Sequence, residues 1–147
     1  MISILEATGQ ERKPLHVFNG RVVKGDGRGK KHGMPTANLD VSSDDKLPEL
    51  GVYSALVFVE GVKYMGVTNV GYRPSVGGDD ITIETYILNL DEDIYDKEIS
   101  VELYHYLRPT QNFNSLYEVK EQIDKDCIRA VAFLNDLFSP GSFEEKQ

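Results

Sequence analysis

Residues 20–38 concentrate the residue types that could bind a phosphate group. They read G-R-V-V-K-G-D-G-R-G-K-K-H-G-M-P-T-A-N, with five glycines and five basic residues against one acid, Asp26. Glycine lets a backbone approach a ligand closely, and successive exposed N–H groups form a concave site for phosphate oxygens. The segment carries a net charge of +4 within a chain of −8. This local reversal of charge indicates a polyanion site and points to nucleotide chemistry.

Two common phosphate-binding motifs do not fit this segment. A P-loop needs a Gly-Lys pair followed by Ser or Thr at the start of a helix, and no Gly-Lys pair here has that continuation. A dinucleotide-binding fingerprint also needs a helix after its glycines, whereas Pro35 and the short β-prone run 37–41 follow them here. We therefore expect backbone amides and basic side chains to hold phosphate without a helix.

Thr36 and Asn38 lie two residues apart, so on an extended chain their side chains share a face. A hydroxyl and an amide oxygen there could ligate Mg²⁺, which otherwise keeps its waters and takes phosphate oxygens. The alternative is that this Pro-Thr-Ala-Asn segment only ends a turn and satisfies local backbone groups. Residue types alone favour that alternative.

Composition narrows the class of protein. A length of 147 residues suits one domain, and no apolar run approaches the ~20 residues that span a bilayer. A lone cysteine, Cys127, cannot form an internal disulfide, so we expect a cytoplasmic protein, and we also expect a monomer. The charge of −8 argues against nucleic-acid and membrane partners, which are anionic. The three histidines lie far apart, so we expect no zinc site.

The remaining sequence must supply the elements that position the glycine-rich segment. β-prone runs predict six strands, at residues 16–24, 37–41, 52–59, 63–70, 81–90 and 98–107. Segment 71–80 holds three glycines and Pro74 and is predicted to be a loop. An apolar stripe at helical spacing over 116–137, opened by a capping box at Ser115, predicts one helix.

Strands without βαβ alternation predict a mainly β fold, an antiparallel barrel closed at one end by the C-terminal helix. Within it we expect Ile83 and Ile87 on one face of their strand, with Ile99, Val101 and Leu103 on the apolar face of another. The expected organisation is a polar extension at 1–15, the barrel and helix at 16–138, and a charged tail at 139–147.

Five blocks of the sequence resemble the ATP-dependent riboflavin kinases of bacteria and eukaryotes. The first is the glycine-rich segment continued to Leu39. The others, in the same order, are L-P-E-L-G-V-Y-S-A at 47–55, G-V-T-N-V-G-Y-R-P-S at 66–75, I-E-T-Y-I-L-N-L-D-E-D-I-Y at 83–95 and L-R-P-T-Q-N-F-N-S-L before the helix. The resemblance implies a six-stranded Greek-key barrel with a C-terminal helix, which agrees with the independent count of strands.

The resemblance implies transfer of the ATP γ-phosphate to the 5′-hydroxyl of riboflavin, giving FMN and ADP with Mg²⁺ or another divalent cation. It assigns the catalytic base to Glu84, and the metal and nucleotide contacts to Thr36 and Asn38. It implies further ATP or phosphate contacts at Gly25, Gly27, Arg28, Gly29, Lys30, Lys31, Gly33, Pro35 and Tyr95. It implies flavin contacts at Asn69, Gly71, Pro74, Ser75, Arg108 and Phe113.

Several of these residues have a second interpretation. Glu84 shares a polar strand face with Thr82 and Tyr86, and most strand glutamates of that kind are simply solvated. The basic side chains of the loop could likewise form a solvated run, and Cys127 on the helical stripe is expected in the core. The alternative to an active kinase is a non-catalytic flavin- or nucleotide-binding module on the same barrel.

The chain also departs from the pattern of the family it resembles. Tyr86 replaces His, Asn89 replaces Asp and Leu90 replaces Phe, while Pro109-Thr110 lacks the acid expected two residues after Arg108. Asp96 occupies a glycine place, so a negative charge and a Cβ stand where the chain is expected to bend near the nucleotide. The phosphate, metal and base positions are retained. We expect no FAD synthesis, because 147 residues leave no room for an FMN adenylyltransferase domain.

Overall fold

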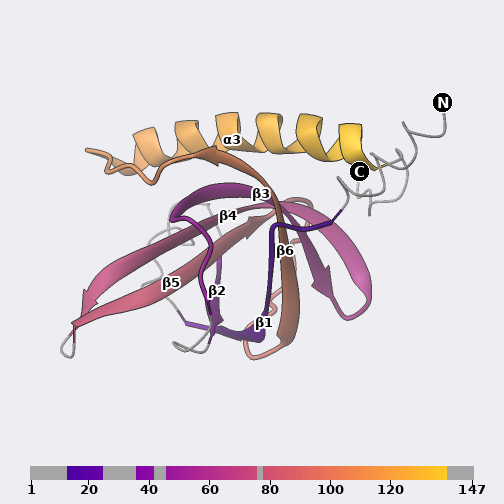
Figure 1. Cartoon of the computed structure of the whole chain (residues 1–147), viewed down its shortest axis with the longest axis horizontal. Coiled ribbons are helices and arrows are strands. Elements are labelled where there is room, and N and C mark those ends of the chain that lie inside the picture. Colours follow the sequence, from indigo (N-terminus) through magenta and orange to yellow (C-terminus); the bar gives the residue numbers. More distant parts are fainter. Residues whose placement is uncertain (1–12, 25–35, 42–45, 76–77, 139–147) are drawn as a thin grey trace.

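Six strands and one helix make up the described part of the chain (Figure 1). The structure is a computed structural model that describes residues 13–24, 36–41, 46–75 and 78–138, with the backbone alone at 73–75 and 78–80. The elements are β1 (His16–Val23), β2 (Ala37–Asp40), β3 (Gly51–Val59), β4 (Val62–Ser75), β5 (Gly78–Ile87), β6 (Glu98–Arg108) and α3 (Leu116–Leu137). The predicted mainly β fold with one C-terminal helix is confirmed.

The strands form a closed antiparallel barrel in the order β1-β2-β5-β4-β3-β6. Strands β3, β4 and β5 are consecutive neighbours, and β6 returns to lie beside β3, which is the Greek-key arrangement. Strand β2 is the shortest, and it pairs with β1 and with β5 over only three positions each. This short strand closes the barrel.

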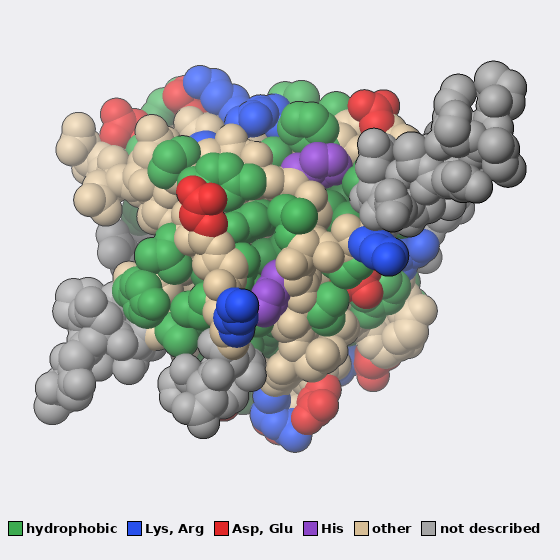
Figure 2. All heavy atoms as spheres, in the orientation of Figure 1, with side chains coloured by type: hydrophobic (Ala, Val, Ile, Leu, Met, Phe, Trp, Pro, Cys, Tyr) green, Lys and Arg blue, Asp and Glu red, His purple; other side chains and the backbone are tan. Residues whose placement is uncertain are grey.

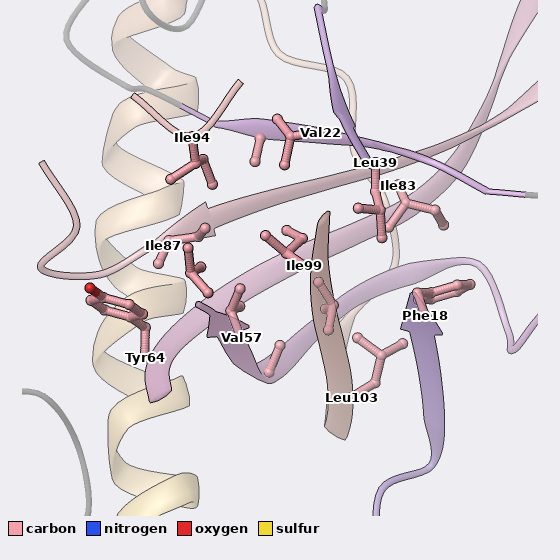
Figure 3. Close-up of a cluster of buried hydrophobic side chains, with 14 of the residues drawn as sticks. Phe18, Val22, Leu39, Val57, Tyr64, Ile83, Ile87, Ile94, Ile99 and Leu103 are labelled. Carbon is pink, nitrogen blue, oxygen red and sulfur yellow. The ribbon is translucent and has the colours of Figure 1, made fainter. Parts of the chain in front are cut away.

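The barrel interior is filled by one inward-facing row of side chains from every strand (Figure 3). Phe18 of β1, Leu39 of β2, Val57 of β3 and Ile83 of β5 are all at most 5% exposed. Each such side chain contributes about 1.5–3 kcal/mol by leaving water. The inward orientation predicted for Ile83, Ile87, Ile99, Val101 and Leu103 is confirmed.

Helix α3 begins where the sequence predicts. Ser115 is its N-cap, and the Ser115 hydroxyl accepts a hydrogen bond of 3.2 Å from the backbone N–H of Glu118. In return the Glu118 carboxylate accepts from the backbone N–H of Asn114 at 2.9 Å, one residue before the expected partner. The predicted apolar stripe faces the barrel, because Cys127, Ala130 and Leu134 are buried.

The prediction that the helix closes one end of the barrel is wrong. Helix α3 lies along the outside of the barrel, against β3, β4 and β6 (Figure 1). Strand β3 explains this position because its outward residues are also apolar: Val52 and Leu56 pack with α3 while Val57 faces the interior. A strand that is apolar on both faces needs a second cover, and α3 supplies it.

The prediction of a loop at 71–80 is also wrong. Strands β4 and β5 continue as a long hairpin in which Gly71 pairs with Thr82 and Ser75 pairs with Gly78. Backbone hydrogen bonds alone can hold such a ladder, whatever the side chains. Pro74 is tolerated because β3 pairs with β4 only as far as Val70, so β4 has one neighbour beyond that point.

Charged side chains are spread over the face of the molecule seen in Figure 2, where acidic and basic groups stand among hydrophobic ones. The exposed ion pairs include Arg21 with Asp96 and Lys120 with Asp124. Exposed pairs of this kind contribute at most about 1 kcal/mol each. Within the described ranges, no helix has the length and apolar character needed to cross a membrane.

Candidate active site

Thr36, Asn38 and Glu84 come together on the outer face of the barrel. The flanking Ala37, Leu39 and Ile83 point into the core, so strand alternation directs these three side chains outward. Asn38 and Glu84 are paired residues of the neighbouring strands β2 and β5. The Thr36 hydroxyl donates a hydrogen bond of 3.1 Å to Oε2 of Glu84. All three are half-buried, so Glu84 is not one of the freely solvated strand glutamates.

Asn69 extends this group onto the next strand. Asn69 of β4 is paired with Glu84 on its other side, so the carboxylate lies between two amides, Asn38 and Asn69. The Thr110 hydroxyl donates to Oδ1 of Asn69 at 2.8 Å. Gly71 follows on the same face, and a Cβ there would lie 3.4 Å from the Asn69 amide nitrogen. We call the row of Asn38, Glu84 and Asn69 the polar row.

The glycine-rich segment joins the barrel at the polar row. Val23 near the end of β1 is paired with Asn38, so the connection between β1 and β2 leaves and returns beside this residue. The predicted phosphate-binding residues Gly25, Gly27, Arg28, Gly29, Lys30, Lys31, Gly33 and Pro35 lie outside the described residues. The described residues establish that the chain leaves β1 at Val23 and enters β2 at Ala37, and both of these points lie next to Asn38.

The oxygen atoms around Asn38 suit a hard cation that keeps most of its coordinated waters or phosphate oxygens. They comprise the Thr36 hydroxyl, the Asn38 amide oxygen and the Glu84 carboxylate. One carboxylate and two neutral oxygens are too few for a closed metal cage, but they suit Mg²⁺, which retains waters and phosphate oxygens. Among the described residues no group of three or more His, Cys, Asp and Glu side chains could hold a metal.

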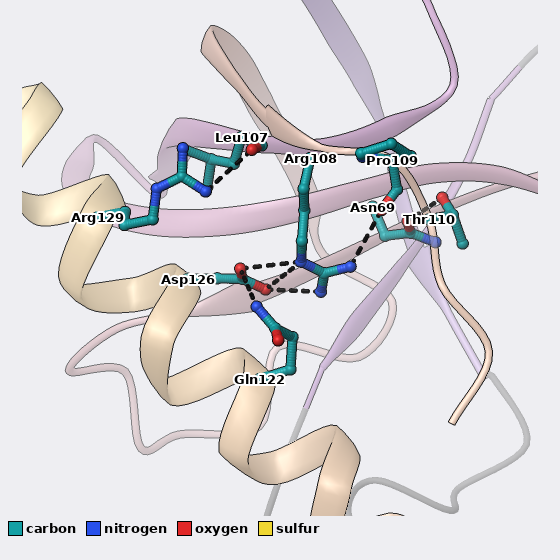
Figure 4. Close-up of polar contacts among 8 residues, drawn as sticks. All are labelled: Asn69, Leu107, Arg108, Pro109, Thr110, Gln122, Asp126 and Arg129. Carbon is teal, nitrogen blue, oxygen red and sulfur yellow. Dashed lines mark hydrogen bonds and ion pairs between the residues drawn. The ribbon is translucent and has the colours of Figure 1, made fainter. Parts of the chain in front are cut away.

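Arg108 and Phe113, predicted flavin contacts, lie at the end of β6 and in the segment after it. The Arg108 guanidinium is 5.9 Å from the centroid of the Phe113 ring. Its Nη2 also forms an ion pair of 2.7 Å with Asp126 of α3 (Figure 4). Arg108 is therefore already neutralised. Pro74 and Ser75, by contrast, lie further along the β4–β5 hairpin, in the pairs beyond Gly71, so the structure does not bring them beside Glu84.

Tyr95 and Asp96 lie in the segment between β5 and β6, where the Asp96 N–H donates to the Val22 carbonyl oxygen of β1 at 2.9 Å. The Tyr95 ring is 49% exposed, and the ammonium of Lys24 lies 5.4 Å from its centroid. Asp96 has a φ of 71°, the left-handed conformation that favours glycine, so the glycine place of the family has the expected backbone. Its carboxylate lies 3.4 Å from Arg21, which also donates to the Asp96 carbonyl oxygen at 2.7 Å. Arg21 therefore offsets the added negative charge.

Tyr86, which replaces a histidine of the family pattern, lies under the helix rather than in solvent. It packs with the outward-facing residues Val52, Val67 and Leu107. Burial, followed by the nearby Cys127 and Asp124, raises the pKa of the Tyr86 hydroxyl above its ordinary value. Tyr86 thus serves the contact between β5 and α3, and this departure leaves the polar row intact.

Three residues near the site were not predicted from the sequence: Thr110, Gln122 and Asp126. Thr110 contacts Asn69, whereas Gln122 and Asp126 of α3 hold Arg108 in place. A signal for Asp126 was present, because it adjoins Cys127 on the apolar stripe of the helix. An acid placed at a buried stripe needs a basic partner from elsewhere in the fold.

The chain matches the Flavokinase family, described as riboflavin kinase, over residues 13–134. It is 37% identical over 134 residues to a bifunctional riboflavin kinase/FMN adenylyltransferase of Listeria monocytogenes. That match covers 90% of this chain and 43% of the relative. The chain thus spans about two fifths of the length of this curated relative.

Two solved structures have the same fold. One, titled a macrolide-efflux protein from Streptococcus pneumoniae, matches with a TM-score of 0.74 and 30% identity, over 80% of this chain and 38% of that one. The other, a riboflavin kinase from Trypanosoma brucei, matches with a TM-score of 0.57 and 21% identity, over 84% of this chain and 80% of that one. The second likeness supports the fold alone. From the match across residues 13–134, together with the barrel and its polar row, this chain belongs to the riboflavin kinase family.

Proposed function

We propose that this chain is an ATP-dependent riboflavin kinase, which transfers the γ-phosphate of ATP to the 5′-hydroxyl of riboflavin and gives FMN and ADP. The observation that carries the proposal is the hydrogen bond between Thr36 and Glu84, with Asn38 and Asn69 on either side of the carboxylate. A half-buried carboxylate fixed between neutral donors is suited to accept a proton from an alcohol.

In this mechanism Glu84 is the general base. The 5′-oxygen of riboflavin forms a bond to the γ-phosphorus, the bond from that phosphorus to the β–γ bridging oxygen breaks, and ADP leaves. The hydroxyl proton passes to the Glu84 carboxylate. Because Thr36 already donates to Oε2, the other oxygen of Glu84 is the one left to accept that proton. The strand holds the carboxylate rigidly, which favours the in-line geometry of phosphoryl transfer.

Thr36 and Asn38 would hold the divalent cation, because they offer neutral oxygens at the point where the glycine-rich segment meets the barrel. When bound, Mg²⁺ neutralises charge on the phosphoryl oxygens. The basic side chains Arg28, Lys30 and Lys31 would add cationic contacts to ATP. These contacts are part of the proposal, since those residues lie in the segment whose ends flank Asn38.

Riboflavin would bind on the opposite side of Glu84 from the nucleotide. Asn69 and Gly71 lie on that side, and the segment carrying Thr110 and Phe113 reaches it from β6. Nucleotide and flavin then approach one carboxylate from β2 and from β4 respectively. In this proposal the two substrates would meet over the Glu84 carboxylate, where the riboflavin 5′-hydroxyl could reach both the base and the γ-phosphate.

Incubation with riboflavin, ATP and Mg²⁺, followed by chromatography of the flavins, tests the proposal. We expect the wild-type chain to form FMN and Glu84→Gln to lower its rate by about 100-fold or more, the usual contribution of a general base. Glu102→Gln is the matched control, because Glu102 is a half-buried strand carboxylate that binds only Tyr104 in the described part of the chain. Tight riboflavin binding without FMN would instead identify a non-catalytic flavin-binding module.

A further inference from the structure

Asp126 of α3 is the only charged side chain that is fully buried among the described residues. Its two oxygens take four contacts of 3.1 Å or less (Figure 4). Nε of Arg108 donates to Oδ1 at 3.0 Å and to Oδ2 at 3.1 Å, and Nη2 donates to Oδ2 at 2.7 Å. Gln122, one turn earlier, donates to Oδ1 at 3.1 Å. The helix thus holds the Arg108 guanidinium in one orientation.

Stability alone does not explain this ion pair. Taking a carboxylate and a guanidinium out of water is costly, and well-packed apolar residues often serve as well or better in such places. A bidentate pair between Arg and a carboxylate does provide a fixed geometry, which apolar contacts do not. The pair is therefore better explained by the position in which it holds Arg108 and the chain beside it.

The guanidinium and its neighbours hold the backbone at the point where β6 ends. Nη1 of Arg108 donates to the carbonyl oxygen of Pro109 at 3.2 Å, and Arg129 of α3 donates to that of Leu107 at 2.9 Å. Arg108 and Val52 form the last pair between β6 and β3, next to a register shift. Beyond this pair β6 has no strand neighbour among the described residues, so we expect side-chain contacts from α3 to set the path of the following residues.

Those residues lead directly to the polar row. Two positions after Arg108, Thr110 donates to Oδ1 of Asn69 at 2.8 Å. Asn69 is the cross-strand partner of Glu84. Because Thr110 takes the oxygen of the Asn69 amide, the amide nitrogen is directed to the other side, where Gly71 leaves space. A short chain of contacts therefore joins the buried carboxylate of α3 to the amide beside the catalytic carboxylate.

We propose that Asp126, supported by Gln122, is a positioning residue for riboflavin. Through Arg108 it fixes the segment 109–113, so that Thr110 orients the Asn69 amide toward the flavin. The inference deepens the proposed function and rests on it. The nucleotide contacts proposed for Thr36 and Asn38 lie just before and within β2, whereas α3 packs mainly against β3, β4 and β6, so we expect the effect to be specific to the flavin substrate.

Steady-state kinetics with each substrate varied in turn test this inference. In Asp126→Asn we expect the KM for riboflavin to rise at least about 10-fold, with the KM for ATP within about twofold of wild type, since a charged hydrogen-bonded pair is broken. Asp124→Asn is the matched control: it removes the same charge from the same helix, but Asp124 is 65% exposed, and its one ion pair within the described residues is with Lys120 at 3.8 Å. Asp124→Asn is expected to leave both KM values unchanged.

Thr110→Val provides a second variant, which leaves the buried pair of Arg108 and Asp126 intact and so does not put folding at risk. Thr110 is exposed, and valine keeps its shape while removing the hydrogen bond to Asn69. We expect the KM for riboflavin to rise about 3- to 10-fold, the range of one lost hydrogen bond. If Asp126→Asn does not fold, this variant alone decides.

Titration of riboflavin fluorescence keeps the two proposals separate, because it measures flavin binding without turnover. A wild-type chain that forms no FMN overturns the proposed function, while a weaker riboflavin Kd in both variants would still support the positioning role. The positioning role is overturned if folded Asp126→Asn and Thr110→Val bind riboflavin as tightly as Asp124→Asn. It is overturned equally if Asp126→Asn raises the KM for ATP as much as that for riboflavin, which would indicate general disruption.

Discussion

Thr36 has two tasks in the proposed mechanism, and the structure shows how one side chain can perform both. Its hydroxyl hydrogen is directed to Oε2 of Glu84, while its oxygen retains lone pairs for a cation. In the proposed mechanism this contact would fix both the rotamer of the base and the position of a metal ligand. Threonine suits this place because its branched Cβ restricts the side chain to few rotamers.

Replacing the Thr36 hydroxyl should slow the chemical step more than it weakens flavin binding. In Thr36→Val we expect kcat to fall about 10- to 100-fold, because a hydrogen bond to a charged group typically contributes about 1.5–3 kcal/mol. Thr36→Ser keeps the hydroxyl and should remain within about threefold of wild type. Initial rates of FMN formation at saturating substrates measure both. Equal rates for the valine and serine variants would exclude the hydroxyl from catalysis.

The buried position of Cys127 suppresses the reactivity of its thiol. Burial, assisted by Asp124 and Asp126, raises the pKa of its thiol from 9.0 to about 12. A raised pKa means that the folded chain keeps the proton while the unfolded chain releases it. The thiol therefore contributes stability fully below pH 9, and this contribution is lost as the pH rises from about 9 to about 12.

The reactivity of the thiol at pH 8 should follow from the same shift. We expect a disulfide reagent to modify folded Cys127 about 1,000-fold more slowly than the denatured chain, since the thiolate fraction falls about tenfold per pKa unit. Absorbance of the released thiolate follows the reaction with and without guanidinium. The alanine variant should lose the extra alkaline destabilisation. Rapid labelling of the folded chain at pH 8 would contradict the buried position.

At the scale of elements, α3 is a brace for three strands, and its two halves differ in role. Apart from Arg129, which donates to the Leu107 carbonyl oxygen, the C-terminal half contributes apolar packing, with Leu134 against Leu56 of β3 and Tyr104 of β6. The N-terminal half carries the polar contacts of Gln122 and Asp126 to the end of β6. The first contributes mainly stability, whereas the second is the half that we link to riboflavin.

Truncation in the apolar half should therefore lower stability without changing substrate affinity. Leu134 is 0% exposed, so Leu134→Ala should cost about 2–5 kcal/mol of unfolding free energy. Ile128→Ala, on the outward face at 72% exposure, is the control and should cost less than about 0.5 kcal/mol. Urea unfolding measures both, and the riboflavin KM of folded Leu134→Ala should equal that of wild type. A selective rise in that KM would remove the distinction between the two halves.

The sequence predicted elements well wherever side-chain periodicity carried the signal. Alternation identified the inward faces of β5 and β6, and the apolar stripe with Ser115 marked the start of α3. It failed at 71–80, where glycines and Pro74 indicate a loop but backbone pairing with β5 forms a hairpin. It also failed on the place of α3, although the apolar run of β3, with Val52 and Leu56 outward as well as Val57 inward, indicates a strand that is covered on both faces.

The site was predictable only in part for a similar reason. Thr36 and Asn38 share a face by spacing alone, but Glu84 reaches them across 48 positions of sequence, and resemblance to the family rather than periodicity identified it. The contact between Arg108 and Asp126 joins two elements whose packing no local pattern encodes. Residues that act through tertiary contacts, such as Thr110, become visible only once the barrel and helix are assembled.

For the whole molecule, the proposed function requires that an acidic chain bind ATP, which is an anion. The net charge of −8 repels ATP, so the local +4 of residues 20–38 must reverse the field where the nucleotide approaches. Strand β2 attaches one end of that segment to the polar row through its short pairings with β1 and β5. Even so, Glu84 adds negative charge beside the proposed phosphate position, and this makes a bound cation important.

Stabilisation by ATP should therefore depend on a divalent cation. At 100 times its Kd, a ligand adds about 2.7 kcal/mol to the unfolding free energy. For a chain of this size that corresponds to a rise in Tm of roughly 5–10 °C. We expect this rise with ATP and Mg²⁺, and less than half of it when EDTA replaces the metal. Differential scanning fluorimetry measures the shift, with riboflavin alone as a metal-independent control.

The variant Asn38→Ala sharpens this test because it removes a proposed metal ligand without altering the charge of the chain. It should lose most of the Mg²⁺-dependent part of the ATP shift and keep the shift caused by riboflavin, since Asn38 lies on the β2 side of Glu84 and the flavin is placed on the β4 side. An ATP shift equal in Mg²⁺ and in EDTA would show that the basic segment alone neutralises the phosphates. In that case Thr36 and Asn38 would contact the nucleotide directly, and the charge balance of the site would rest on residues 20–38.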